Sequence, residues 1–142
     1  MRLLQVVLFA LSIGLWTSCN SSSSENASKD IRLNQYLIEG KKIYESHCAN
    51  CHQVDGKGFA RLYPPIDSVF LRDTTATLQI ILMGNKNPLT VKGIEYTLPM
   101  PGHDFFTDLE LAELSTYLYA TWSGQKAQRI STETVKTLRE NP

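Results

Sequence analysis

The sequence has no excess of either charge, and its apolar stretch near the amino terminus is short. Fourteen basic and fourteen acidic side chains balance each other among 142 residues. A chain without net charge has no strong field to attract nucleic acid, so we expect no nucleic-acid partner. The length suits one domain with a leader and excludes two ordinary domains. The apolar stretch, residues 3–16, is too short for a comfortable transmembrane helix.

This apolar stretch has the features of an export signal. Arg2 precedes it, and the small residues Thr17 and Ser18 follow it. Residues 1–18 therefore predict a signal peptide. Cys19 falls at the expected cleavage site, so the segment resembles a lipoprotein signal in which Cys19 becomes the lipidated first residue. Ordinary cleavage, which would leave a free thiol at Cys19, is the alternative. Either way, the chain is expected on the periplasmic side of a bacterial membrane.

The segment after Cys19 is polar and of low complexity. Residues 20–28 contain mainly serine and asparagine and offer almost nothing apolar to bury. We therefore predict a flexible polar tether over residues 19–33. The remaining residues, 34–142, are predicted to form the folded domain.

Cysteine is scarce, with three in the chain, and two of these lie close together. Cys48 and Cys51 are separated by two residues, and His52 follows at once. This spacing is the attachment signature of c-type haem. Each thiol can reach one vinyl group on the same edge of the porphyrin, and the histidine then lies under the iron. The motif predicts one covalent haem c per chain, bound through Cys48 and Cys51, with His52 as an axial ligand.

Two other kinds of site use a Cys-x-x-Cys pair. A structural zinc site needs four ligands, usually as two separated pairs. Cys19 is the only other cysteine, and neither His47 nor His103 has a paired spacing. A thioredoxin-like dithiol needs a strand before the motif, whereas residues 39–45 have a helical pattern. Zinc and dithiol chemistry are therefore the less favoured alternatives.

The residues after the motif offer a partner for the histidine. A metal-bound histidine normally donates its second ring N–H to an acceptor. Pro64 and Pro65 provide carbonyl groups on a rigid backbone with no competing N–H. We expect the carbonyl of Pro64 to hold the His52 ring, with Pro65 as the neighbouring candidate. The alternative is that the two prolines only stiffen a loop.

A second ligand is predicted in the proline-rich loop of residues 85–104. Met100 lies between Pro99 and Pro101, which restrict the backbone around it. A thioether is a weak ligand for iron, so a loop that holds its sulfur in place is needed. We predict Met100 as the distal ligand, with His103 as the main rival. Met83 has helical spacing, at which a methionine usually fills a core.

Helical patterns surround these loops. Apolar residues recur at three- and four-residue intervals from about Asn34 into Cys48. Residues 75–84 predict a short helix with a threonine start and a glycine stop. Thr107 and Glu110 predict a capping box for a helix that ends near Trp122. A shorter polar helix is predicted from Ser131, so the domain is expected to be all-α.

The combined pattern resembles the class I monohaem cytochrome c family in its bacterial form, over roughly residues 34–123. In that family a glycine and an aromatic of the first helix cross a leucine and an aromatic of the last helix. The matching features are the 48–52 motif, Pro64, Met100 before a proline, Gly40 with Tyr44, and Leu114 with Tyr117. The resemblance implies an all-α cytochrome c fold of about four to five helices around one covalent haem with His52 and Met100 on the iron. Tyr63 replaces a common glycine and is expected to cover the haem.

The resemblance and the two ligands together predict a one-electron carrier in a periplasmic respiratory chain, not an enzyme. The expected donor is a quinol-oxidising complex or a periplasmic dehydrogenase, and the expected acceptor is a terminal oxidase or reductase. The chain would act as a monomer or as a subunit of a respiratory complex, held at the membrane by its lipid. A haem enzyme or gas sensor with an open distal position is the alternative.

Overall fold

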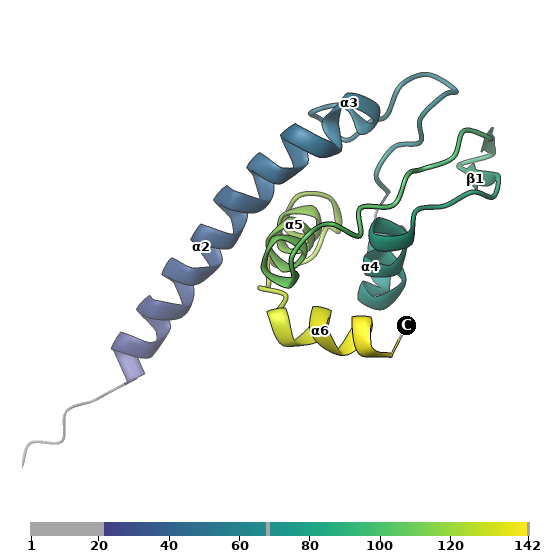
Figure 1. Cartoon of the computed structure of the whole chain (residues 1–142). Coiled ribbons are helices and arrows are strands. Elements are labelled where there is room, and N and C mark those ends of the chain that lie inside the picture. The colour runs from purple at the N-terminus through teal and green to yellow at the C-terminus, as the bar shows by residue number, and fades with distance from the viewer. Residues whose placement is uncertain (1–21, 68, 142) are drawn as a thin grey trace, which may run out of the picture. The chain divides into compact units, whose positions relative to one another are not determined.

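A computed structural model describes residues 22–67 and 69–141, and within these ranges the chain is mostly helical (Figure 1). The predicted all-α fold is confirmed, with one small two-stranded sheet in addition. The elements are α2 (Ser22–His47), α3 (Ala49–His52), the 3-10 helix η1 (Phe70–Arg72), α4 (Thr74–Met83), β1 (Leu89–Val91), β2 (Ile94–Tyr96), α5 (Asp108–Trp122) and α6 (Thr132–Glu140).

The predicted signal peptide, residues 1–18, and the predicted lipid site at Cys19 lie outside the described residues. None of the helices in the described part of the chain is both long enough and apolar enough to cross a membrane.

Helix α2 begins at Ser22, and not near Asn34 as the apolar pattern predicted. The predicted tether over residues 19–33 is therefore helical from Ser22 onward. Residues 22–33 contain neither proline nor glycine. A helix that is already formed extends through such a segment because adding a residue costs much less than nucleation. Residues 31–142 form the compact unit that carries the site.

The predicted crossing of the first and last long helices is present. A β-carbon built on Gly40 would lie 2.1 Å from the carbonyl oxygen of Glu113 and 2.8 Å from Cβ of Tyr117. Only a glycine lets two helix backbones approach this closely. The rings of Tyr44 and Tyr117 lie next to the crossing, 5.7 Å apart. Tyr44 and Leu114 are completely buried, so the crossing is part of the core.

Helix α5 begins with the predicted capping box. The Oγ1 of Thr107 accepts a hydrogen bond from the backbone N–H of Glu110 at 3.2 Å. The carboxylate of Glu110 accepts from the backbone N–H of Thr107 at 2.8 Å. Two N–H groups that the helix leaves without partners are satisfied in this way.

Helix α4 begins at Thr74, one residue before the predicted start, and Asp73 caps it. The Asp73 side chain accepts from the N–H of Ala76, and the helix ends before Gly84. Aspartate and threonine are both good caps. In a run of such residues, the sequence therefore determines the first helical residue only to within one or two positions.

The loop predicted over residues 85–104 contains the antiparallel hairpin β1–β2. Its register pairs Leu89 with Tyr96, and the turn residues Lys92 and Gly93 both have positive φ angles, 49° and 77°. Positive φ at both positions is typical of a tight hairpin turn. The buried Tyr96 brings this hairpin into the core.

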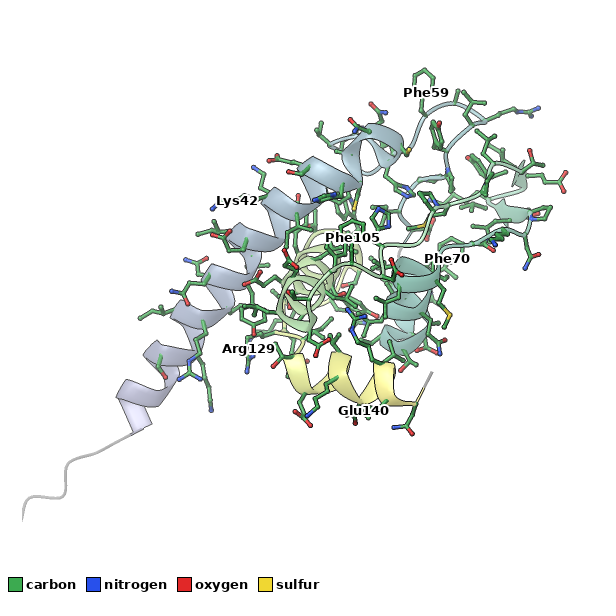
Figure 2. All side chains as sticks on the ribbon, in the orientation of Figure 1. Lys42, Phe59, Phe70, Phe105, Arg129 and Glu140 are labelled. Atoms are coloured by element: carbon green, nitrogen blue, oxygen red, sulfur yellow. The ribbon has the colours of Figure 1, made fainter. Side chains whose placement is uncertain are left out.

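The terminal helix α6 packs below α4 and α5 in the view of Figure 1. Val135 is fully buried and Leu138 is 7% exposed. The segment between α5 and α6 is fixed to α2, because the guanidinium of Arg129 lies 5.1 Å from the ring centre of Tyr36 and donates to its hydroxyl (Figure 2). Residues after Trp122 are therefore part of the folded unit.

Candidate haem site

The two cysteines and the histidine lie on one helical turn. Cys48 joins α2 to α3, and its N–H donates to the carbonyl of Tyr44 at 2.9 Å. The N–H of His52 donates in turn to the carbonyl of Cys48 at 2.9 Å. Because the backbone is helical from Cys48 to His52, the three side chains project to the same side. This is the arrangement that two thioether bonds and a neighbouring iron ligand require.

His52 has the partner that the sequence predicted. Its Nδ1 lies 3.0 Å from the carbonyl oxygen of Pro64. Burial lowers the pKa of His52, the hydrogen bond to Pro64 opposes this shift, and nearby His103 adds to it. A lowered pKa favours the neutral imidazole, which is the form that binds a metal. Nε2 is then the nitrogen that remains for iron.

Two further side chains, which the sequence did not single out for this role, fix the loop after His52. The hydroxyl of Tyr44 donates to the carbonyl of Gln53 at 2.5 Å. The indole N–H of Trp122 donates to the carbonyl of Asp55 at 3.2 Å. Both donors come from the helix crossing, so the core holds the loop after His52 in place. In the sequence, Tyr44 and Trp122 stood out only as aromatic residues at helical spacing.

Met100 is held at the end of α4. Its N–H donates to the carbonyl of Asn85 at 2.8 Å, and its carbonyl accepts from the N–H of Asn85 at 2.9 Å. A β-carbon on Gly84 would lie 2.3 Å from the carbonyl oxygen of Met100, so this approach requires glycine. Met83, in contrast, is 65% exposed and not part of a core. Of the two described methionines, Met100 therefore remains the candidate iron ligand.

Cys48, Cys51, His52 and Met100 line one cleft of the structure. Its wall is largely apolar and comes from the loops and from α4 and α5. The wall includes Tyr63, Ile66, Leu71, Ile80, Ile81, Leu98, Leu114 and Leu118. Tyr63 thus lies at the position expected of a residue that covers a haem. An apolar cleft with a few convergent polar groups suits a flat, largely apolar cofactor.

Asp67, which the sequence did not identify, also lines this cleft. It is 7% exposed, and its carboxylate lies 2.8 Å from the ammonium group of Lys92. The pair joins the loop after Pro65 to the β1–β2 hairpin. No spacing in the sequence signals such a contact, because the two residues belong to segments with irregular structure.

His103 lies on the same wall as Met100. Its ring stacks on Phe106 with the planes 8° from parallel and the centres 5.5 Å apart. Its Nδ1 is buried and has no hydrogen-bond partner within the described ranges. A buried polar nitrogen without a partner, on a residue that lines an apolar cleft, fits a ligand that brings its own polar groups, such as the carboxylates of a haem. The residues present therefore fit the cofactor that the motif predicts.

The two alternative uses of the cysteines receive no support. No group of three or more His, Cys, Asp or Glu side chains that could hold a metal ion occurs in the part of the chain that the structure describes. Burial, with a smaller effect of Cys51, raises the pKa of the Cys48 thiol to about 12. A reactive dithiol needs a lowered thiol pKa. The fold and the cleft instead define a helical haem c protein.

Comparisons with known proteins agree with this class. A model of the cytochrome c family matches residues 37–122, which is more than half of the chain. The chain belongs to the cytochrome c family, and it carries electrons by means of a covalently bound haem c.

Individual relatives are distant. A quinone alcohol dehydrogenase cytochrome c subunit of Gluconobacter oxydans is 27% identical over 104 residues, which are 70% of this chain but 22% of that subunit. Cytochrome c-552 of Thermus thermophilus is 27% identical over 111 residues, which are 71% of this chain and 84% of that protein. The chain thus spans less than a quarter of the dehydrogenase subunit and most of the length of the cytochrome c-552.

Proposed function

We propose that the protein is a one-electron carrier in which His52 and Met100 are the two axial ligands of the haem iron. The observation that supports this best is the position of the four groups. The two thiols and His52 lie on one helical turn, Met100 lies on a loop fixed to α4, and all four line one cleft. With both axial positions filled, a substrate has no place on the iron, so the protein is not an enzyme.

The residues around the haem site act by keeping its surroundings in a fixed arrangement. When bound, haem c supplies the one-electron change between iron(II) and iron(III). The Pro64 carbonyl orients the His52 ring, and the Asn85 backbone holds Met100. The apolar wall keeps water away from the centre. An environment that is fixed in advance does not have to rearrange when the charge changes, which favours fast transfer.

Carbon monoxide tests this proposal against a haem enzyme or a gas sensor. The reduced protein should bind the gas slowly and incompletely at neutral pH, because Met100 must leave the iron first. Met100→Ala should bind it rapidly, whereas Met83→Ala should behave as the wild type. Rapid, complete binding by the wild-type protein would contradict a closed site and favour the enzyme or sensor.

The proposed partners are redox proteins of a respiratory chain. The donor is a quinol-oxidising complex or a periplasmic dehydrogenase, and the acceptor is a terminal oxidase or reductase. The similarity to a cytochrome c subunit of a quinone alcohol dehydrogenase supports a place beside a dehydrogenase. The loop after His52 offers exposed apolar side chains for contact, with Val54 72%, Phe59 53% and Leu62 47% exposed. Figure 2 shows Phe59 pointing away from the helices.

We further propose that the chain is exported to the periplasmic side and anchored by lipid on Cys19. Several acyl chains on one residue give stable anchoring, because each buried methylene contributes about 0.8 kcal/mol. Full-length protein made in a bacterial host should sediment with membranes, and detergent should release it. Cys19→Ser should move the haem protein to the soluble fraction. Unchanged membrane binding of this variant would exclude the lipid anchor.

A further inference from the structure

Helix α6 lies beyond the family match, which ends at Trp122, and it carries an arginine that contacts the segment following Met100. Arg139 donates through Nε to the carboxylate of Asp108 at 2.7 Å. Its Nη2 donates to the carbonyl of Phe106, and its Nη1 lies 3.5 Å from the carbonyl oxygen of Asp104. One guanidinium thus binds three acceptors within five residues of the chain.

The part of α6 that carries Arg139 is held in place by the core. Val135 and Leu138, on the inner face of α6, are buried against α4 and α5. At the start of the helix, Ser131 caps the N–H of Thr134 at 3.1 Å. The N–H of Ile130 donates to the buried hydroxyl of Thr116 at 2.9 Å. Arg139 therefore acts from a rigid support and not from a free tail.

The contacted segment is continuous with the methionine loop. Residues 100–103 are held on one side by the end of α4, where the N–H of His103 donates to the carbonyl of Ile81 at 2.9 Å. Residues 104–108 are held on the other side by Arg139. The ring of Phe106 stacks on that of His103, which lines the cleft beside Met100. If the Phe106 backbone shifts, the stacked ring of His103 moves with it, and so does the side of the cleft on which Met100 lies.

We propose that Arg139 is a positioning residue that keeps Met100 on the iron by fixing the 104–108 segment. This inference rests on the proposed ligation by Met100. An external ligand replaces Met100 only in a state in which the loop has moved, and the contacts of Arg139 disfavour that state. Removing them makes the displaced state easier to reach, so external ligands bind more tightly.

The test measures binding of imidazole to the oxidised holoprotein at neutral pH. The charged hydrogen bonds of Arg139 are lost in Arg139→Gln, which should bind imidazole about ten times more tightly than the wild type, a change of about 1.4 kcal/mol. Arg139→Lys keeps the charge but cannot reach all three acceptors, and it should fall between the two. Lys136→Gln, which removes an exposed cation from the same helix, should match the wild type.

Gly93→Ala separates positioning from general loosening, because it strains the β1–β2 turn and leaves α6 with Arg139 in place. It should lower the free energy of unfolding without changing imidazole affinity. Equal affinity of Arg139→Gln and the wild type, or an equal gain in Gly93→Ala, would overturn the inference. If the wild-type protein itself lacks the long-wavelength sulfur-to-iron band, the ligation by Met100 fails instead, which is a different result.

Discussion

Gly40 and Glu113 bring the backbones of α2 and α5 into contact, since a β-carbon on Gly40 would lie 2.1 Å from the Glu113 carbonyl oxygen. This contact supports Tyr44, whose hydroxyl holds the loop after His52. The helix crossing therefore positions the loop on the His52 side of the haem site.

Gly40→Ala should destabilise the holoprotein even though alanine favours a helix by about 1 kcal/mol over glycine. The added methyl group clashes with backbone atoms, which cannot rotate away as a side chain can. Overpacking of this kind costs about 1–3 kcal/mol. We expect a net loss in the free energy of unfolding, measured with guanidinium. Asn34→Ala, at an exposed position of the same helix, should cause no loss. An unchanged midpoint for Gly40→Ala would contradict the close crossing.

Gly58→Ala should change the iron's reduction potential as well as the stability. Gly58 has φ of +69°, and a β-carbon there would lie 2.6 Å from the Pro64 carbonyl oxygen that binds His52. Displacing this carbonyl makes the histidine less basic, and the potential should rise. The measurement is a potentiometric titration.

Gly93→Ala is the matched control for Gly58→Ala. Its φ is +77°, but nothing lies within 4 Å of a β-carbon there. It should lose about 1–2 kcal/mol of stability from backbone strain alone, with no change in potential. Equal potentials in the two variants would argue against a role for the Pro64 contact.

Thr107→Ala should destabilise the protein in a manner that depends on pH. Hydrogen bonds from Thr107 lower the pKa of Glu110 below its ordinary value of 4.5. A carboxyl group with a lowered folded-state pKa stabilises the fold above the unfolded pKa and loses this effect as the pH falls through the folded pKa. The variant should therefore lose about 1 kcal/mol at neutral pH and less in acid.

Unfolding with urea at neutral pH and below the folded pKa of Glu110 checks this expectation. Ser131→Ala is the control, because Ser131 caps α6 with no acidic residue at the matching position, which is Thr134. The free energy of unfolding that Ser131→Ala loses should not become smaller in acid in this way. A constant loss for Thr107→Ala over this range would show that the Thr107 hydroxyl, which donates to the Glu110 carboxylate at 2.8 Å, does not stabilise its charged form.

The sequence predicted those parts of the site that depend on local spacing. The 48–52 motif and the capping box at Thr107 each use residues a few positions apart, so one pattern carries the information. The crossing at Gly40 joins distant helices and was expected from the resemblance to the cytochrome c family. The contact of His52 with Pro64 was also expected, because a proline carbonyl is a typical acceptor for a bound histidine.

Contacts between distant segments were not predictable in this way. Arg139 and Phe106, or Asp67 and Lys92, are brought together only by the packed fold. The hairpin β1–β2 was missed because prolines and glycines on both sides indicated a loop. The start of α2 was missed because an apolar pattern marks the buried part of a helix and not its exposed extension.

The absorption spectrum of the oxidised holoprotein tests the central claim most directly. With Met100 on the iron, the spectrum should contain the long-wavelength sulfur-to-iron band, and Met100→Ala should lose it. Met83→Ala, which alters an exposed methionine, should keep the band. A band that is absent from the wild type, or that survives in Met100→Ala, would contradict the account.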